Sequence, residues 1–180
     1  TGTLSVPFLS VGSDSSGWLS IPGTFLPMTG YLDELRVWNV ARSEAQIQGG
    51  RCQSITSAPG LGFSMPFEAD LDDHGPYALG MGAQGNAQLQ SYSPTACATP
   101  AFSAAYMGGL NGFNYLSTNA GSLPELNFGM SDFSFEFWIN PVLNGEKRIL
   151  NYSGGFPDSY WVVDILADGG VQMEMRAVGG

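Results

Sequence analysis

The sequence predicts an all-β fold, an antiparallel β-sandwich, on three observations. First, the 180 residues include 25 Gly and 11 Pro, which suit short strands joined by tight turns. Second, 12% of the residues are charged, against about 25% in an average soluble domain, and Lys, which favours helices, occurs once. Third, apolar and polar residues alternate with a period of two between turn signals. Hydrophobic residues make up 43% of the chain, enough for a packed core.

The clearest strand is expected at residues 131–141, SDFSFEFWINP. Apolar residues occupy every second position from Phe133 to Ile139, so they share one face of the strand. A second strand is expected at residues 31–39, with Leu35 and Val37 on one face and Glu34, Arg36 and Trp38 on the other.

Weaker strand patterns are short and bounded by turn residues. We expect strands at residues 3–12, 18–21, 62–70, 87–92, 102–107, 115–117 and 147–152. Residues 159–178 predict a final hairpin hinged at Asp168-Gly169-Gly170, a turn sequence that permits positive φ.

One short helical turn is expected near residues 43–48. Ser43 and Gln46 have the spacing of a capping box, in which each side chain bonds the other residue's backbone amide. Gly49 and Gly50 are expected to end the helix, and residues 49–60 are interpreted as a linker.

The net charge of −10 and the pI near 4.1 argue against nucleic acid and anionic membranes as partners. The sequence contains no run of 18 apolar residues, so it predicts no membrane-spanning segment. Neither a signal peptide nor an initiator Met is visible, so we expect the chain to be part of a longer precursor. Clustered carboxylates favour Ca²⁺, a cation that prefers oxygen ligands.

Two cysteines, Cys52 and Cys97, lie in stretches of loop character. A disulfide between them would stabilise the fold by about 3–4 kcal/mol in the chain-entropy model, and it predicts an extracellular or cell-surface location. Two free thiols are the alternative. Asn151-Tyr152-Ser153 is a glycosylation sequon, relevant only in a eukaryotic source and at an exposed position.

Two parts of the chain resemble a known family. Residues 30–39, GYLDELRVWN, with the following Ala41-Arg42-Ser43 and Ile47, resemble the closing strand and helical turn of laminin-G-like domains. These domains belong to the concanavalin A-like lectin/glucanase superfamily. The opening strands of the same family are similar to residues 67–73 (FEADLDD), 102–116 and 132–139 (DFSFEFWI).

The resemblance implies a jelly-roll sandwich in permuted order. Residues 1–48 resemble the C-terminal portion of one unit and residues 61–180 the N-terminal portion of the next, while the family's middle hairpin has no counterpart. The chain is thus two incomplete domains, a permutant whose parts close on each other, or a donor of strands to a neighbouring chain.

The candidate site residues follow from both sources. Family members hold Ca²⁺ beside their first and last strands, so the resemblance implies Asp33 with Asp72 or Asp73 as ligands, the alternative being a solvated acidic turn. Trp38 and Trp138 are the candidates for stacking on a sugar, because their strand neighbours on the same face are polar. Packing in the core is the alternative for each indole.

The expected function is a non-catalytic extracellular module for adhesion or structural assembly, a building block of an array or filament. Its partners would be other copies of itself, neighbouring repeats or glycans. The alternative is a carbohydrate-binding, lectin-like module of a secreted enzyme. A glucanase is a remote alternative, because the superfamily's catalytic E-x-D-x-E triplet does not occur in the sequence.

Overall fold

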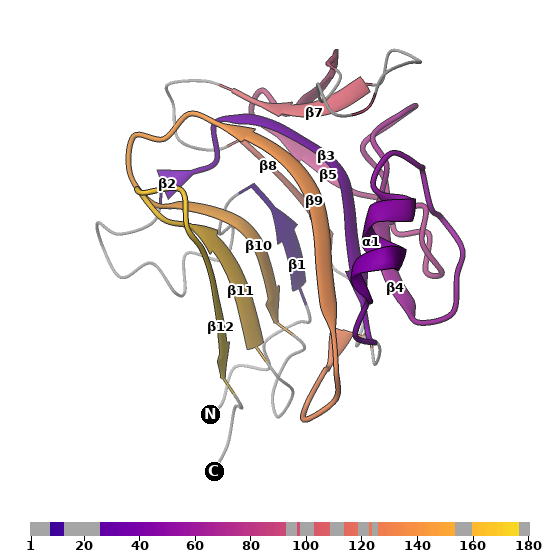
Figure 1. The fold of residues 1–180 in the computed structure, drawn as a ribbon. Helices are drawn as coiled ribbons and strands as arrows, with labels where there is room; N and C mark the ends of the chain where they lie inside the picture. Colours follow the sequence, from indigo (N-terminus) through magenta and orange to yellow (C-terminus); the bar gives the residue numbers. More distant parts are fainter. Residues whose placement is uncertain are drawn as a thin grey trace, which may run out of the picture.

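The computed structural model describes residues 8–12, 26–92, 97, 103–108, 114–118, 123, 126–153 and 160–176. These residues form two β-sheets that face each other, with one short helix on the outside of the smaller sheet (Figure 1). The strand pairs are antiparallel, except for a parallel pair between β2 and β10. The prediction of an all-β antiparallel sandwich is therefore confirmed.

Within the described residues, seven strands form the larger sheet. They are β1 (Phe8–Val11), β2 (Leu26–Pro27), β5 (Gly82–Gln84), β8 (Tyr115–Thr118), β10 (Lys147–Ser153), β11 (Tyr160–Ile165) and β12 (Val171–Arg176). The smaller sheet, as described, has five strands. They are β3 (Gly30–Trp38), β4 (Leu61–Met65), β6 (Gln88–Ser91), β7 (Ser103–Met107) and β9 (Ser134–Pro141).

The core lies between the two sheets and takes side chains from both. Leu35 and Val37 of β3 are buried in it, as the alternation predicted, and Arg36 and Trp38 point to the opposite face. The apolar row of residues 133, 135, 137 and 139 also packs against the core. Burial of one face thus fixes the period-two pattern of both strands.

The two parts of the chain meet within one molecule. β1 lies between β8 and β10 in the larger sheet, and β3 pairs with β9 along its length in the smaller one. Strands from residues 8–38 are therefore embedded among strands from residues 61–176.

The helix α1 spans Glu44–Gly50, and its capping box between Ser43 and Gln46 is present as predicted. The helix ends at Gly50, within the glycine pair predicted to end it, but both glycines are helical and Arg51 follows in the αR conformation. Gly50 packs closely instead, since a Cβ there would lie 2.9 Å from Ile55 Cδ1. Among the described residues, no helix is long and apolar enough to span a membrane.

Other predicted elements differ at their ends. The strand expected at 62–70 stops at Met65, because Phe67 adopts a φ of +59° and the chain turns away. Short strands β2 and β5 were not predicted, and the segment expected at 18–21 lies outside the described residues. The final hairpin is confirmed: Gly169 has a φ of +86°, and Asp168 accepts a hydrogen bond from the Gly170 amide.

Candidate functional site

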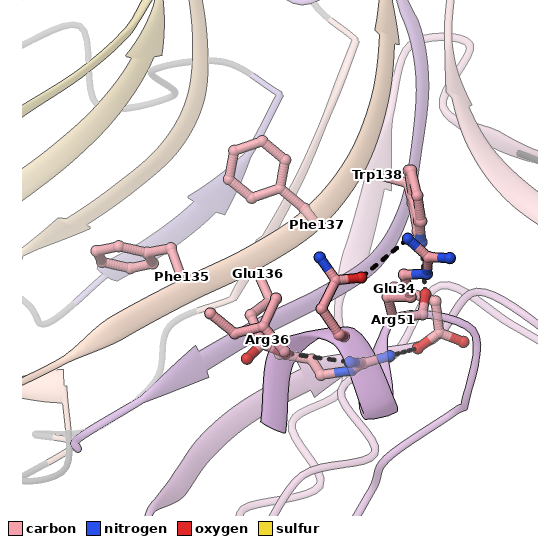
Figure 2. A pocket seen from close by; sticks show the side chains of 9 residues that line it. Glu34, Arg36, Arg51, Phe135, Glu136, Phe137 and Trp138 are labelled. Carbon is pink, nitrogen blue, oxygen red and sulfur yellow. Dashed lines mark hydrogen bonds and ion pairs between the residues drawn. The ribbon is translucent and has the colours of Figure 1, made fainter. Parts of the chain in front are cut away.

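A cavity of about 350 Å³ lies between α1 and the outer face of the smaller sheet (Figure 2). We call it the α1 cavity. It is lined by Glu34, Arg36, Ile47, Gln48, Arg51, Phe135, Glu136, Phe137 and Trp138. Its volume falls within the range of small-molecule sites, about 300–1,000 Å³.

Strand register places the polar side chains of the cavity. Arg36 of β3 lies directly opposite Glu136 of β9, and Asp33 lies opposite Trp138. Residues directly opposite in an antiparallel pair point to the same face of the sheet, which here is the face that α1 covers. Phe135 and Phe137, the neighbours of Glu136 on β9, point away from Arg36 and the helix (Figure 2).

A bulge in β3 adds a second carboxylate. The register with β9 shifts between Asp33 and Arg36, and Glu34 has a φ of +50°, a conformation that side-chain-bearing residues rarely adopt. The bulge lies between the part of β3 that pairs with β7 and the part that pairs with β4. It brings the Glu34 carboxylate to the guanidinium of Arg36.

Four buried or nearly buried charges then form one cluster, which we call the α1 charge network: Glu34, Arg36, Arg42 and Glu136. Arg36 pairs with Glu34 and also, at 3.2 Å, with Glu136. Arg42 Nε lies 3.0 Å from the other oxygen of Glu136. The network links β3 and β9 to Arg42, just before α1. Its two carboxylates and two guanidinium groups balance in charge.

Backbone carbonyls after the helix complete the coordination of Arg36. Its guanidinium donates to the carbonyl oxygen of Gly50 at 3.1 Å and to that of Gln53. Ser54 donates its hydroxyl to Glu34 at 2.7 Å. The segment after α1, which the sequence analysis interpreted as a linker, is therefore held on the sheet by buried polar contacts. Arg36 is 1% exposed, yet its Nε makes no hydrogen bond.

Trp138 and Arg51 form the opposite side of the cavity. The indole Nε1 of Trp138 donates to the backbone oxygen of Arg51 at 2.6 Å. The Arg51 side chain donates to the amide oxygen of Gln48 at 3.0 Å. Cys52, the next residue, forms a disulfide with Cys97, as the sequence predicted. The disulfide joins the residues after α1 to Cys97, which lies in the connection between β6 and β7.

Trp38, the other candidate for sugar stacking, is placed differently. Its side chain is 0% exposed, and the guanidinium of Arg42 lies 3.9 Å from the ring centroid. The contact is a cation–π interaction over a ring that the fold has already covered. The indole offers no face to a ligand, and only Trp138 lines the cavity.

The three candidate calcium ligands are occupied by backbone amides. Asp33 is 2% exposed and accepts the Glu34 amide at 2.9 Å. Asp73 accepts amides of the 64–79 region through both oxygens, and Asp72 accepts the Met81 amide at 2.7 Å. In the described part of the chain, no group of three or more His, Cys, Asp or Glu side chains is placed to hold a metal ion.

Burial controls the ionisation of two of these carboxyls. Desolvation, followed by repulsion from the Glu34 carboxylate, raises the pKa of Asp33 from 3.8 to about 7. Desolvation also raises the pKa of Asp73, although its three backbone hydrogen bonds oppose the shift. Both groups are thus costly to ionise within the fold.

Asn151 of the sequon is 1% exposed and lies in β10, between β1 and β11. The exposure that glycosylation requires is therefore not met in the folded protein.

Sequence reasoning identified Trp138 but missed the α1 charge network and Arg51. A signal was present: Arg36 and Glu136 each stand on the polar face of a strongly apolar strand. Their pairing depends on register between segments 100 residues apart, which the sequence pattern does not contain. Comparison of the chain with protein-family models, curated proteins and solved structures gives no match.

Proposed function

We propose that the chain is a non-catalytic extracellular β-sandwich module for adhesion or structural assembly, with laminin-G-like, jelly-roll topology. One observation carries the proposal: one side of the sandwich is open in the part of the chain that the structure describes. β9 forms the edge of the smaller sheet there, and among the described strands it pairs with β3 alone. The ladder groups on its other side are available to a further strand.

The larger sheet extends past β9 on this side. Phe135 of β9 packs on Trp161 of β11, with ring centroids 5.1 Å apart. β12 is the next strand after β11 and the last in its sheet, so it lies beyond the edge of the smaller sheet (Figure 1).

The inner face of β12 is apolar and, among the described residues, only partly covered: Met173 packs against the core, and the residues on either side of it on this face do not. Val171, Met173 and Met175 lie opposite residues of β11 that are buried in the core, so they point to the core side of the sheet. Val171 is nevertheless 62% exposed and Met175 is 37% exposed. A single extended strand from a neighbouring copy would pair with β9 and cover this row.

The carboxylates of the α1 cavity support the non-catalytic part of the proposal. Glycoside hydrolysis needs two carboxyl groups free to act on either side of one bond. Glu34 and Glu136 are both bound to the guanidinium of Arg36, and Glu136 is bound to Arg42 as well. The Cys52–Cys97 disulfide is compatible with an oxidising, extracellular location.

Sedimentation velocity over a concentration series tests assembly. The parent chain is expected to form larger species as its concentration rises, and the double variant Val171→Lys/Met175→Lys is expected to remain monomeric. Val40→Lys, an equally apolar exposed position beside α1, serves as the matched control and should assemble like the parent. A parent chain that stays monomeric at millimolar concentration, or a double variant that assembles normally, would refute the proposal.

Carbohydrate binding is the second candidate, and the α1 cavity favours it. Trp138 is half-buried, with its indole in the lining beside Gln48, Arg51 and Glu136. An aromatic surface next to hydrogen-bonding side chains suits a sugar, whose C–H faces pack on rings and whose hydroxyls need polar partners. Calorimetric titration with neutral and acidic monosaccharides tests this candidate.

A further inference from the structure

We infer that the outer face of the smaller sheet carries a binding surface for a neutral oligosaccharide, at the end of β3 that α1 does not cover. The inference rests on the second function proposed above, carbohydrate binding, and names the class of sugar and a second place where it binds. The residues concerned are three tyrosines and three amides of that face, which we call the tyrosine row: Gln88, Gln90, Tyr92, Tyr106, Tyr31 and Asn140.

Strand register brings the tyrosine row together. Tyr31 of β3 lies directly opposite Asn140 of β9 and also directly opposite Tyr106 of β7. Gln88 of β6 lies opposite Tyr106 in turn. Directly opposite residues point to the same face of a sheet, and this is the outer face, since Leu32, the next residue of β3, is in the core. Strands about 4.8 Å apart give a row of about 14 Å across β6, β7, β3 and β9, which suits a short oligosaccharide better than a single sugar.

The three tyrosine rings hold one another in place. Tyr31 stacks on Tyr92 with ring centroids 4.3 Å apart, and Tyr106 packs against Tyr31 with centroids 5.1 Å apart. A Cβ at Gly108 would lie 1.9 Å from Cε1 of Tyr106, so this ring lies directly on the backbone of the glycine. All three tyrosines nevertheless remain partly exposed. Rings that are fixed before binding lose little conformational entropy when a sugar packs on them.

Amide side chains beside the rings supply the polar partners that a sugar needs. The Tyr31 hydroxyl donates to Oε1 of Gln90 at 3.1 Å, and Nδ2 of Asn140 donates to the Tyr92 hydroxyl oxygen at 3.0 Å. These bonds leave the amide nitrogen of Gln90, Oδ1 of Asn140 and the hydroxyl hydrogen of Tyr92 for a ligand. A sugar hydroxyl both donates and accepts, so it matches a surface that offers both kinds of group.

The chemistry of the tyrosine row favours a neutral sugar over an anionic one or a protein. None of its side chains is charged, although the chain has 16 Asp and Glu residues. An anionic sugar would gain no ion pair there and would be repelled by the net charge of −10. The buried centre of a protein–protein interface is more apolar than its rim, yet none of the large exposed hydrophobic side chains of the described residues belongs to the row.

The tyrosine row ends next to the α1 cavity. Trp138 precedes Asn140 by two positions on β9, so both side chains lie on the same face, and Trp138 lines the cavity. An oligosaccharide on the row would therefore have one end beside the indole. The cavity would bind a terminal sugar, and the row would bind the sugars that follow it.

Isothermal titration of the full chain with cellohexaose, mannohexaose and xylohexaose tests the inference, each compared with the methyl glycoside of its own sugar. At least one hexasaccharide is expected to bind about tenfold more tightly than its methyl glycoside, the effect of one further aromatic contact. Tyr106→Ala should remove this gain and leave binding of the methyl glycoside unchanged. The double variant Gln88→Ala/Asn140→Ala, at two exposed positions, should weaken the hexasaccharide in the same direction. Tyr115→Ala, at a partly exposed tyrosine of β8 in the larger sheet, is the matched control.

The outcomes separate the tyrosine row from carbohydrate binding in general. Equal binding of hexasaccharide and methyl glycoside, or a gain that survives both variants, would overturn the inference and leave binding in the α1 cavity intact. Binding of no probe at millimolar concentration would overturn both. Hexagalacturonate that binds as tightly as the neutral probes would overturn the selectivity for a neutral sugar.

A protein partner is the remaining alternative for this face. Sedimentation that changes on Tyr106→Ala in the absence of sugar, with no probe bound, would show that the row is a contact between copies of the chain and that the inference is wrong. Thermal unfolding establishes that each variant is folded. The exposed amide variant decides the outcome if Tyr106→Ala does not fold.

Discussion

Replacing Asp33 by Asn is expected to stabilise the protein at neutral and alkaline pH and to leave it unchanged in acid. The carboxyl is 2% exposed, and its pKa in the folded state is about 7, against 3.8 for the ordinary group. The folded chain therefore binds the proton more tightly than the unfolded chain. Its contribution to stability is complete below pH 3.8 and is lost progressively as the pH rises to about 7.

The size of the effect follows from the shift. About three pKa units at 1.36 kcal/mol each give about 4 kcal/mol as an upper limit, reached above pH 7. Asn resembles the protonated carboxyl in shape, and its Oδ1 accepts the Glu34 amide as Asp33 does. The variant thus keeps the hydrogen bond and removes only the buried charge.

Urea unfolding followed by tryptophan fluorescence, from pH 4 to pH 8.5, measures the effect. The free energies of unfolding of the two proteins should nearly agree at pH 4 and diverge progressively between pH 4 and pH 7, with the variant the more stable. Asp132→Asn, at an exposed residue just before β9, is the control and should show no such divergence. A difference that does not change with pH, or a variant less stable than the parent at pH 8, would refute the reasoning.

Four further variants test the fold. Arg36→Met should lower the free energy of unfolding by about 3–5 kcal/mol, since it leaves the buried Glu34 carboxylate without a cationic partner and Glu136 with Arg42 alone; an unchanged urea midpoint would contradict this. Replacing Cys52 and Cys97 by Ser should cost about 3–4 kcal/mol, and equal stability of the reduced parent and the double variant is the check. Gly30→Ala should prevent stable folding, because its Cβ would lie 2.2 Å from a backbone oxygen at a φ of +137°. Gly49→Ala, with open space around it, should stabilise α1 by about 0.5–1 kcal/mol. Calorimetric unfolding of the two glycine variants is the measurement, and a stable Gly30→Ala or a destabilised Gly49→Ala would contradict these expectations.

Local signals in the sequence predicted much of the fold. The period of two in β9, the Asp168-Gly169-Gly170 turn and the Ser43 capping box each depend on neighbouring residues. Each appears in the structure for that reason. The short strands β2 and β5 were missed because only their partners define them.

The candidate site was predicted less well, because it depends on pairing between distant segments. Trp38 and Trp138 look alike in the sequence, each with polar neighbours on its face of a strand. In the structure Trp38 is buried with Arg42 over its ring, whereas Trp138 lines the cavity. The burial of Asp33 next to Glu34 likewise depends on the β3 bulge, and no local sequence pattern predicts that bulge.

The order of strands along the chain also bears on synthesis. β1 pairs with β10, and β3 pairs with β9 along its length, so these strands wait during synthesis for partners made more than 90 residues later, although β4 and β7 reach β3 sooner. An early product would expose the apolar faces of β1 and β3 without a sheet to receive them. We therefore expect the sandwich to fold slowly and only after β10 has been made, and the nascent chain to need a chaperone until then.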